Sequence, residues 1–130
     1  MDGDKHNSLL NRSESMSFLW KTNGKTITFV ENISKIRFSL TFADILWAIS
    51  QINRELAIQG YCSLYDFLTY LEVKDELNSA FYQQLGWSLG TGSDEYGYFY
   101  IDVSFQAVIK EDQVYVIIDY IFPPHDDYLD

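Results

Sequence analysis

The residues from Gly86 to Gly97 read GWSLGTGSDEYG, a stretch rich in glycine. A glycine-rich loop that cradles phosphate ends in Gly-Lys-Ser/Thr at the start of a helix. This stretch contains no lysine, and Asp94 and Glu95 would repel a phosphate group. We therefore interpret it as a turn that leads into a strand, and not as a nucleotide site.

Cys62 is the one cysteine, and His6 and His125 are the two histidines. A Cys–His nucleophile pair needs the thiol beside an imidazole. Both histidines lie in predicted tails, whereas Cys62 lies between a predicted helix stop and a helix cap. The pattern favours a small packed residue at Cys62 and predicts no catalytic residue.

Carboxylates offer two further arrangements. Asp102 and Asp119 are predicted on the polar face of one sheet, where paired carboxylates do acid–base work or hold a metal. The C-terminal HDDYLD offers oxygen and nitrogen ligands, but a short tail forms a poor cage. Solvated strand carboxylates and adventitious metal binding are the simpler interpretations, so no cofactor and no metal site are predicted.

Three predicted helices occupy the middle of the chain. Thr41 and Ser63 each have an aspartate three residues later, which is related to the capping box at a helix start. Gly60 has the place of a C-terminal helix stop. A third, short helix is predicted over residues 74–85.

Strands are predicted on both sides of these helices. Asn23-Gly24 has the chemistry of a type I′ turn and predicts a hairpin over Ser17–Val30. The sequences YFYIDVSFQAVI and VYVIIDYIF alternate apolar and polar residues and predict a second hairpin.

The loop of the second hairpin sets its register. An even-length loop around Glu111-Asp112 places Phe105 opposite Ile118 and leaves Asp119 on the polar face. An odd-length loop would turn Asp119 towards the core, so the even loop is favoured.

These elements predict an α+β fold, in which an antiparallel sheet built from N-terminal and C-terminal β-hairpins packs against two to three helices. Residues 1–16 are predicted as a polar N-terminal tail, residues 17–124 as a single α+β domain, and residues 125–130 as an acidic C-terminal tail.

Composition excludes several classes of function. The chain has 130 residues, is 47% hydrophobic and carries a net charge of −10, so it can bury a core but lacks the basic patches that grip nucleic-acid phosphates. The same charge argues against docking to an anionic membrane.

The first sixteen residues lack the apolar run of a signal peptide, and the single cysteine leaves no intrachain disulfide. We expect a reducing, intracellular location.

Short motifs between Ile45 and Pro124 resemble a family of small uncharacterised proteins encoded by phages and integrative elements of mainly Gram-positive bacteria. The motifs are GYCSLYDFL, LGW and the hairpin that ends in IDYIFPP. The chain departs from that pattern between Leu71 and Leu85, where EVKDELNSAFYQQ stands in place of a tight Leu-Gly. The resemblance implies a mobile-element origin and brings no catalytic residues.

Acidic residues are distributed unevenly along the chain. Residues 94–130 contain nine acids and one lysine, whereas residues 1–93 contain ten acids and eight basic residues. The acidic part is also rich in tyrosine, which is enriched at protein interfaces. The candidate interaction surface comprises Asp94, Glu95, Tyr98, Tyr100, Asp102, Asp119 and, on the first helix, Trp47.

We expect a non-enzymatic phage protein that acts by binding a basic protein partner, in the cytoplasm of the bacterial host. The most specific version of this expectation is an inhibitor of a host nucleic-acid enzyme, such as an anti-CRISPR-type acidic mimic. One alternative is a virion structural or accessory protein. Another is an immunity-type protein that neutralises a toxin. No direct contact with nucleic acid or membrane is expected, and a homo-oligomer is compatible with the sequence.

Overall fold

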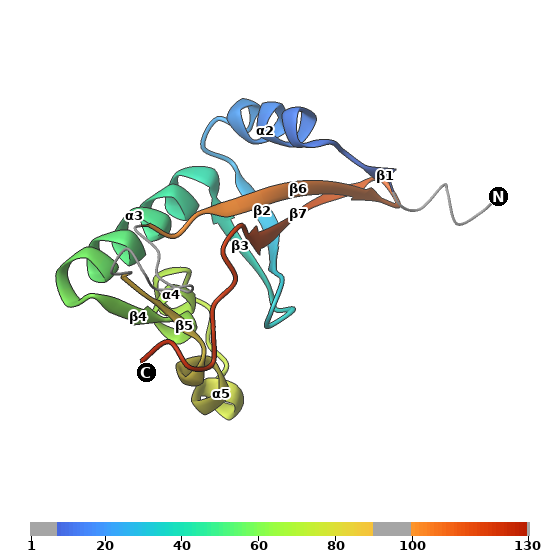
Figure 1. Ribbon diagram of the computed structural model, residues 1–130. Helices are drawn as coiled ribbons and strands as arrows, with labels where there is room; N and C mark the ends of the chain where they lie inside the picture. The colour runs from blue at the N-terminus through green and yellow to red at the C-terminus, as the bar shows by residue number, and fades with distance from the viewer. Residues whose placement is uncertain (1–7, 90–99, 130) are drawn as a thin grey trace. The chain divides into compact units, whose positions relative to one another are not determined.

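The computed structural model describes residues 8–89 and 100–129 (Figure 1). Its contacts group the chain into two compact units, each made of two separate segments. Unit 1 comprises Met1–Asp44 and Val103–Asp119, and unit 2 comprises Ile45–Asp102 and Tyr120–Asp130. Because the segments alternate along the chain, no linker in the sequence marks the two units.

Unit 1 is built on a five-stranded sheet with the order β1-β6-β7-β2-β3 (Figure 1). Its strands are β1 (Ser8–Leu9), β2 (Thr26–Glu31), β3 (Arg37–Thr41), β6 (Val103–Lys110) and β7 (Gln113–Tyr120). The predicted α+β class is confirmed, and the sheet is mostly antiparallel. One pair, β2 with β7, is parallel. Parallel neighbours need a long crossover, and the chain between these two strands supplies it.

The C-terminal hairpin has the predicted loop. Only Glu111 and Asp112 separate β6 from β7, and both have positive φ values, 52° and 67°, as a type I′ turn requires. Phe105 and Ile118 are buried, whereas Asp119 is exposed. The even-length loop therefore keeps the apolar residues of both strands on the core face.

The predicted hairpin over Ser17–Val30 is wrong. Residues Arg12–Lys21 form the helix α2, and Asn11 caps its start in a capping box with Glu14. Asn23 and Gly24 do adopt positive φ values, but their turn joins a helix to β2. The turn chemistry specifies a local chain reversal and not the element that precedes it.

Tertiary contacts explain why this segment is helical. Ser15 and Leu19, four residues apart on α2, are both buried, and the hydroxyl of Ser15 accepts a hydrogen bond of 2.9 Å from the Ala107 backbone N–H in β6. The N-terminal hairpin exists farther along the chain, where β2 pairs with β3 and places Phe29 opposite Phe38.

Unit 2 is mainly helical. It contains the helix α3 (Phe42–Gln59) from Ile45 onward, α4 (Leu64–Tyr70), the 3₁₀ turn η1 (Glu76–Asn78), α5 (Ser79–Gln84), and a two-stranded sheet of β4 (Tyr61–Ser63) and β5 (Gly86–Ser88). The predicted helix starts are confirmed, because Thr41 with Asp44 and Ser63 with Asp66 exchange capping hydrogen bonds. Gly60 ends α3 with φ +85°.

Gly86 and Trp87 lie at the centre of unit 2. The Trp87 ring is fully buried, and its indole N–H donates to the Phe122 carbonyl at 2.7 Å. Gly86 exchanges two backbone hydrogen bonds with His125. A Cβ on Gly86 would clash with the Cys62 carbonyl oxygen and would lie 2.7 Å from the Tyr128 ring.

We predict that Gly86→Ala destabilises the chain by about 2 kcal/mol or more, because the added methyl has no room beside the Cys62 carbonyl oxygen and the Tyr128 ring. Urea unfolding followed by tryptophan fluorescence measures the change. Ser88→Ala in the same strand is the control and should cost less than about 1 kcal/mol. Equal stability of Gly86→Ala and the wild type would show that the segments separate without cost.

We also predict that the double variant Glu111→Asn, Asp112→Gly stabilises the chain by about 1 kcal/mol. Both native residues adopt a left-handed conformation that costs non-glycine residues about 1 kcal/mol, and Asn-Gly is favoured there. The control Glu111→Gln, Asp112→Ser removes the same charges without the turn preference. If the control stabilises equally, charge repulsion and not backbone conformation limits this turn.

Candidate functional site

The residues of the predicted interaction surface are divided among unit 1, unit 2 and the part of the chain outside the described residues. Asp94, Glu95 and Tyr98 lie outside the described residues. Asp119 is exposed in unit 1, whereas Asp102 belongs to unit 2. The prediction that these carboxylates share one docking face therefore stays a prediction.

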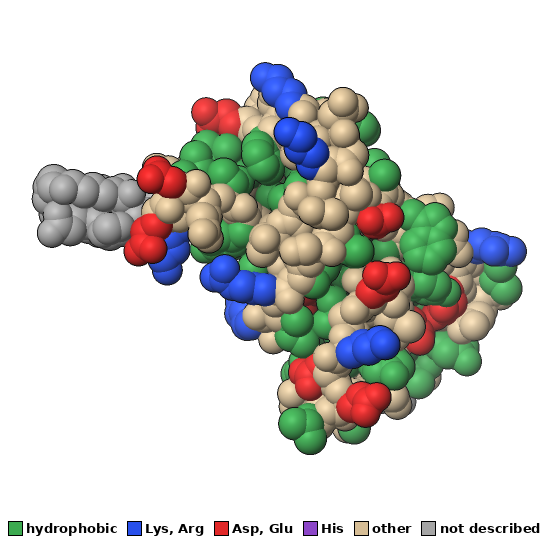
Figure 2. All heavy atoms as spheres, turned by 180° about the vertical axis from the view of Figure 1, so that it is seen from behind, with side chains coloured by type: hydrophobic (Ala, Val, Ile, Leu, Met, Phe, Trp, Pro, Cys, Tyr) green, Lys and Arg blue, Asp and Glu red, His purple; other side chains and the backbone are tan. Residues whose placement is uncertain are grey.

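The aromatic members of that surface, Trp47 and Tyr100, both lie in unit 2 and are 55% and 54% exposed. Each ring forms an edge-to-face contact with another ring, Trp47 with Tyr70 and Tyr100 with Phe122. Large hydrophobic side chains reach the molecular surface beside acidic ones on the face drawn in Figure 2.

Asn53 holds the segment that contains Tyr100. Its side-chain oxygen accepts from the Ile101 N–H at 2.6 Å, and its amide nitrogen donates to the Ile101 carbonyl at 2.9 Å. Since a side-chain amide has one acceptor and one donor side, a single residue of α3 satisfies both backbone groups of Ile101.

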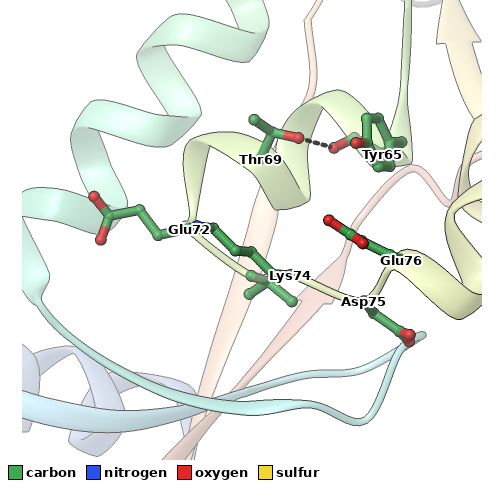
Figure 3. Close-up of a pocket in the computed structure, with 7 residues that line it drawn as sticks. Tyr65, Thr69, Glu72, Lys74, Asp75 and Glu76 are labelled. Atoms are coloured by element: carbon green, nitrogen blue, oxygen red, sulfur yellow. Dashed lines mark hydrogen bonds between the residues drawn. The ribbon is translucent and has the colours of Figure 1, made fainter.

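A hollow of about 510 Å³, the α4 groove, lies between α4 and the segment that follows it (Figure 3). Its lining residues are Tyr65, Thr69, Glu72, Val73, Lys74, Asp75 and Glu76. Val73 is almost completely buried, whereas Tyr65 and the charged residues at either end are partly or fully exposed.

The end of α4 creates this groove. Glu72 has a φ of +63°, its N–H donates to the Thr69 carbonyl, and the Val73 N–H donates to the Leu68 carbonyl. This is the Schellman pattern, in which one left-handed residue reverses the chain at a helix end. The segment after the helix therefore runs back beside α4.

Carboxylates dominate the charge of the α4 groove. Asp75 Oδ2 accepts hydrogen bonds from the Asn78 amide at 2.9 Å and the Tyr82 hydroxyl at 2.7 Å, which lower the pKa of Asp75. Within the described residues, the carboxylates of Glu72 and Glu76 form no ion pair. Lys74 is the one basic residue that lines the groove, against three acids.

A second group of titratable side chains lies between α3 and α4. The Tyr70 hydroxyl donates to Glu55 Oε1 at 3.0 Å. Burial, a hydrogen bond with Asp66 and the charge of Asp66 raise the pKa of Glu55 from 4.5 to about 7, although the bond from Tyr70 acts in the opposite direction. Glu55 therefore takes up a proton near neutral pH.

The same group determines the state of Cys62. Burial, followed by the nearby charges of Glu55 and Asp66, raises the pKa of the thiol well above its ordinary value. A thiolate is the nucleophilic form of cysteine, so Cys62 is poorly suited to nucleophilic catalysis. Its full burial agrees with the packing role that its sequence position suggests.

The sequence pattern predicted neither the titratable group between α3 and α4 nor the α4 groove. Glu55 has the appearance of an ordinary helix residue, and Asp66 is recognisable only as a capping residue, because their proximity depends on how α4 packs against α3. The α4 groove had a visible signal. Three acids fall within the six residues that follow the helix, in the part of the chain that departs from the phage-protein pattern.

A family of unknown function (DUF6353) matches residues 4–129, which is nearly the whole chain. The chain belongs to this family. Neither a curated protein nor a solved structure shows significant similarity to it.

Membrane-spanning helices and metal-binding clusters are both absent from the described residues. None of the helices within residues 8–89 and 100–129 is long and apolar enough to cross a membrane. No group of three histidine, cysteine or acidic side chains in that part of the chain is arranged to hold a metal ion. The carboxylates of the α4 groove are thus too widely spread for one shared ion.

We predict that the stability of the chain falls as pH rises from about 5 to about 8. The pKa of Glu55 is higher in the folded chain than its ordinary value, so the folded state favours the protonated form. The stabilisation is complete below about 4.5 and is lost as pH passes about 7. Urea unfolding at several pH values measures the slope.

The variant Glu55→Gln should remove this slope, because the amide cannot ionise and still accepts the bond from Tyr70. Glu72→Gln is the matched control and should keep it. A slope that persists in Glu55→Gln would assign the pH dependence to another group.

Proposed function

We propose that the chain is a non-enzymatic protein that binds a partner protein with a basic surface, and that unit 2 makes the contact. The observation that carries this proposal is the division of charge between the units. Unit 1 contains eight of the nineteen acids and seven of the nine basic residues, for a net charge of −1. Unit 2 contains eleven acids and two basic residues, for a net charge of −9.

This division locates the acidity more sharply than the sequence did. The acidic C-terminal part of the sequence includes Glu111, Asp112 and Asp119, all of which belong to unit 1. A surface of one sign attracts a partner of the opposite sign and accelerates its association. Charge complementarity therefore supports a basic partner for unit 2.

Exposed aromatic side chains in unit 2 support the same proposal. Trp47, Tyr61, Phe81 and Tyr100 are each at least 46% exposed. Aromatic residues are enriched at the centres of protein interfaces, where they add contact area at low cost in conformational entropy. Acids supply long-range attraction, and aromatic rings supply short-range contact.

Binding is favoured over nucleophilic catalysis because the one cysteine, Cys62, is fully buried and burial raises the pKa of its thiol. The resemblance to proteins of phages and integrative elements supports a mobile-element origin. On that basis the most specific form of the proposal is an acidic inhibitor of a host nucleic-acid enzyme that acts in the bacterial cytoplasm.

Affinity capture from a bacterial lysate, with matched charge variants, tests the proposal. The unit 2 variant is Glu76→Gln, Asp126→Asn, Asp127→Asn, and the unit 1 variant is Glu111→Gln, Asp112→Asn, Asp119→Asn. We expect the wild type and the unit 1 variant to retain basic proteins at low salt and the unit 2 variant to lose them. Retention should also fall at high salt, where the Debye length shrinks to about 3 Å at 1 M.

Association kinetics with the captured protein, once it is purified, complete the test. Electrostatic attraction acts mainly on the association rate, so the unit 2 variant should associate more slowly. If no basic protein is retained at low salt, or if both variants bind alike, the proposal is wrong. Capture of a toxin would favour the immunity-type alternative, and presence in purified virions would favour the structural one.

A further inference from the structure

We infer that the α4 groove is a docking site for an arginine side chain of the basic partner. This inference rests on the proposed function and identifies the part of unit 2 that makes a specific contact. The lining, the charge and the internal hydrogen bonds of the groove each fit a guanidinium group on a long apolar stem.

The walls of the groove fit the stem and the plane of an arginine. Tyr65 on α4 is 37% exposed, Val73 is almost completely buried, and both line the groove. The methylene groups of arginine pack on apolar surface while the charged end remains in water. The guanidinium plane also stacks on aromatic rings such as that of Tyr65.

The three carboxylates of the groove fit a guanidinium group better than they fit a metal ion. Figure 3 shows the Glu76 carboxylate directed back towards α4, whereas Glu72 and Asp75 point to opposite sides. The described residues contain no cluster of acids that could hold a metal ion. A guanidinium presents five donors in a planar fork and can bridge separated acceptors.

Hydrogen bonds within the chain support the geometry of the groove. The hydrogen bonds from Asn78 and Tyr82 hold the Asp75 carboxylate in place, and the Schellman turn at Glu72 sets the direction of the segment. A preformed site loses less conformational entropy on binding. Glu76 is the central acceptor, because it is directed into the groove and forms no ion pair within the described chain.

A peptide with one charged side chain tests this site. The probe is acetyl-Gly-Arg-Gly-amide, titrated into the ¹⁵N-labelled full chain at low salt, with acetyl-Gly-Lys-Gly-amide as the comparison. We expect saturable amide shifts confined to the α4 groove, around Thr69 and Val73–Glu76. The arginine peptide should bind more tightly, because lysine lacks the planar fork and the stacking surface.

Two variants with the same change of charge provide the control. Glu76→Gln should weaken the arginine peptide about threefold or more, as expected for the loss of one exposed ion pair. Glu72→Gln, on the same segment but directed away, should weaken it less. Tyr65→Leu should reduce the preference for arginine over lysine. All three positions are exposed, and circular dichroism checks that each variant is folded.

Equal weakening by Glu76→Gln and Glu72→Gln would overturn the inference, because only the general field of unit 2 would then be acting. Shifts spread evenly to Asp126 and Asp127 would overturn it as well. If the groove fails but the unit 2 variant still loses its captured proteins, the proposed function stands and the contact lies elsewhere. If capture fails too, both are rejected.

Discussion

The close approach of three backbone segments at Gly86 is the constraint on which unit 2 depends. The strand β4 passes on one side, the segment around His125 pairs on another, and the Tyr128 ring covers the Cα. Trp87 follows at once and fills the core behind this contact. Gly86, which has no side chain, allows the close backbone contact. Trp87, which has the largest side chain, fills the core at the next position. The Leu-Gly-Trp motif is structural, and it secures the two-stranded sheet from which α4 starts.

Asp66 connects this framework to the titratable group between the helices. Its carboxylate caps α4 by accepting from the Ser63 N–H, and it also raises the pKa of Glu55. A capping residue normally contributes about 1 kcal/mol to its own helix. Here burial and the same carboxylate raise the pKa of Glu55 on α3. One aspartate therefore contributes both to a helix start and to the protonation of a neighbouring carboxylate near neutral pH.

The division of charge gives the two units different physical characters. Unit 1 has nearly balanced charge and a sheet with an alternating core face. Unit 2 contains eleven of the nineteen acids, including Asp66 in the capping box of α4, and it exposes aromatic rings such as those of Trp47 and Phe81. Like charges on one unit repel one another and lower its stability. A basic partner would relieve this repulsion by neutralising the acids of unit 2 on binding. This relief agrees with the proposed binding function.

The sequence by itself determined those features that depend on neighbouring residues. The caps at Thr41 and Ser63, the stop at Gly60 and the two-residue loop at Glu111-Asp112 follow from hydrogen bonds and φ values within a few positions, so the pattern predicted them. The tertiary structure decided everything that depends on distant partners. Residues 12–21 became a helix because Ser15 and Leu19 are buried within unit 1, although the Asn23-Gly24 turn alone suggested a hairpin. The parallel pairing of β2 with β7, the raised pKa of Glu55 and the shape of the α4 groove likewise arise from segments far apart in the chain. Local patterns carry no information about which of those segments will meet, because packing in the folded chain selects among arrangements that are locally equivalent.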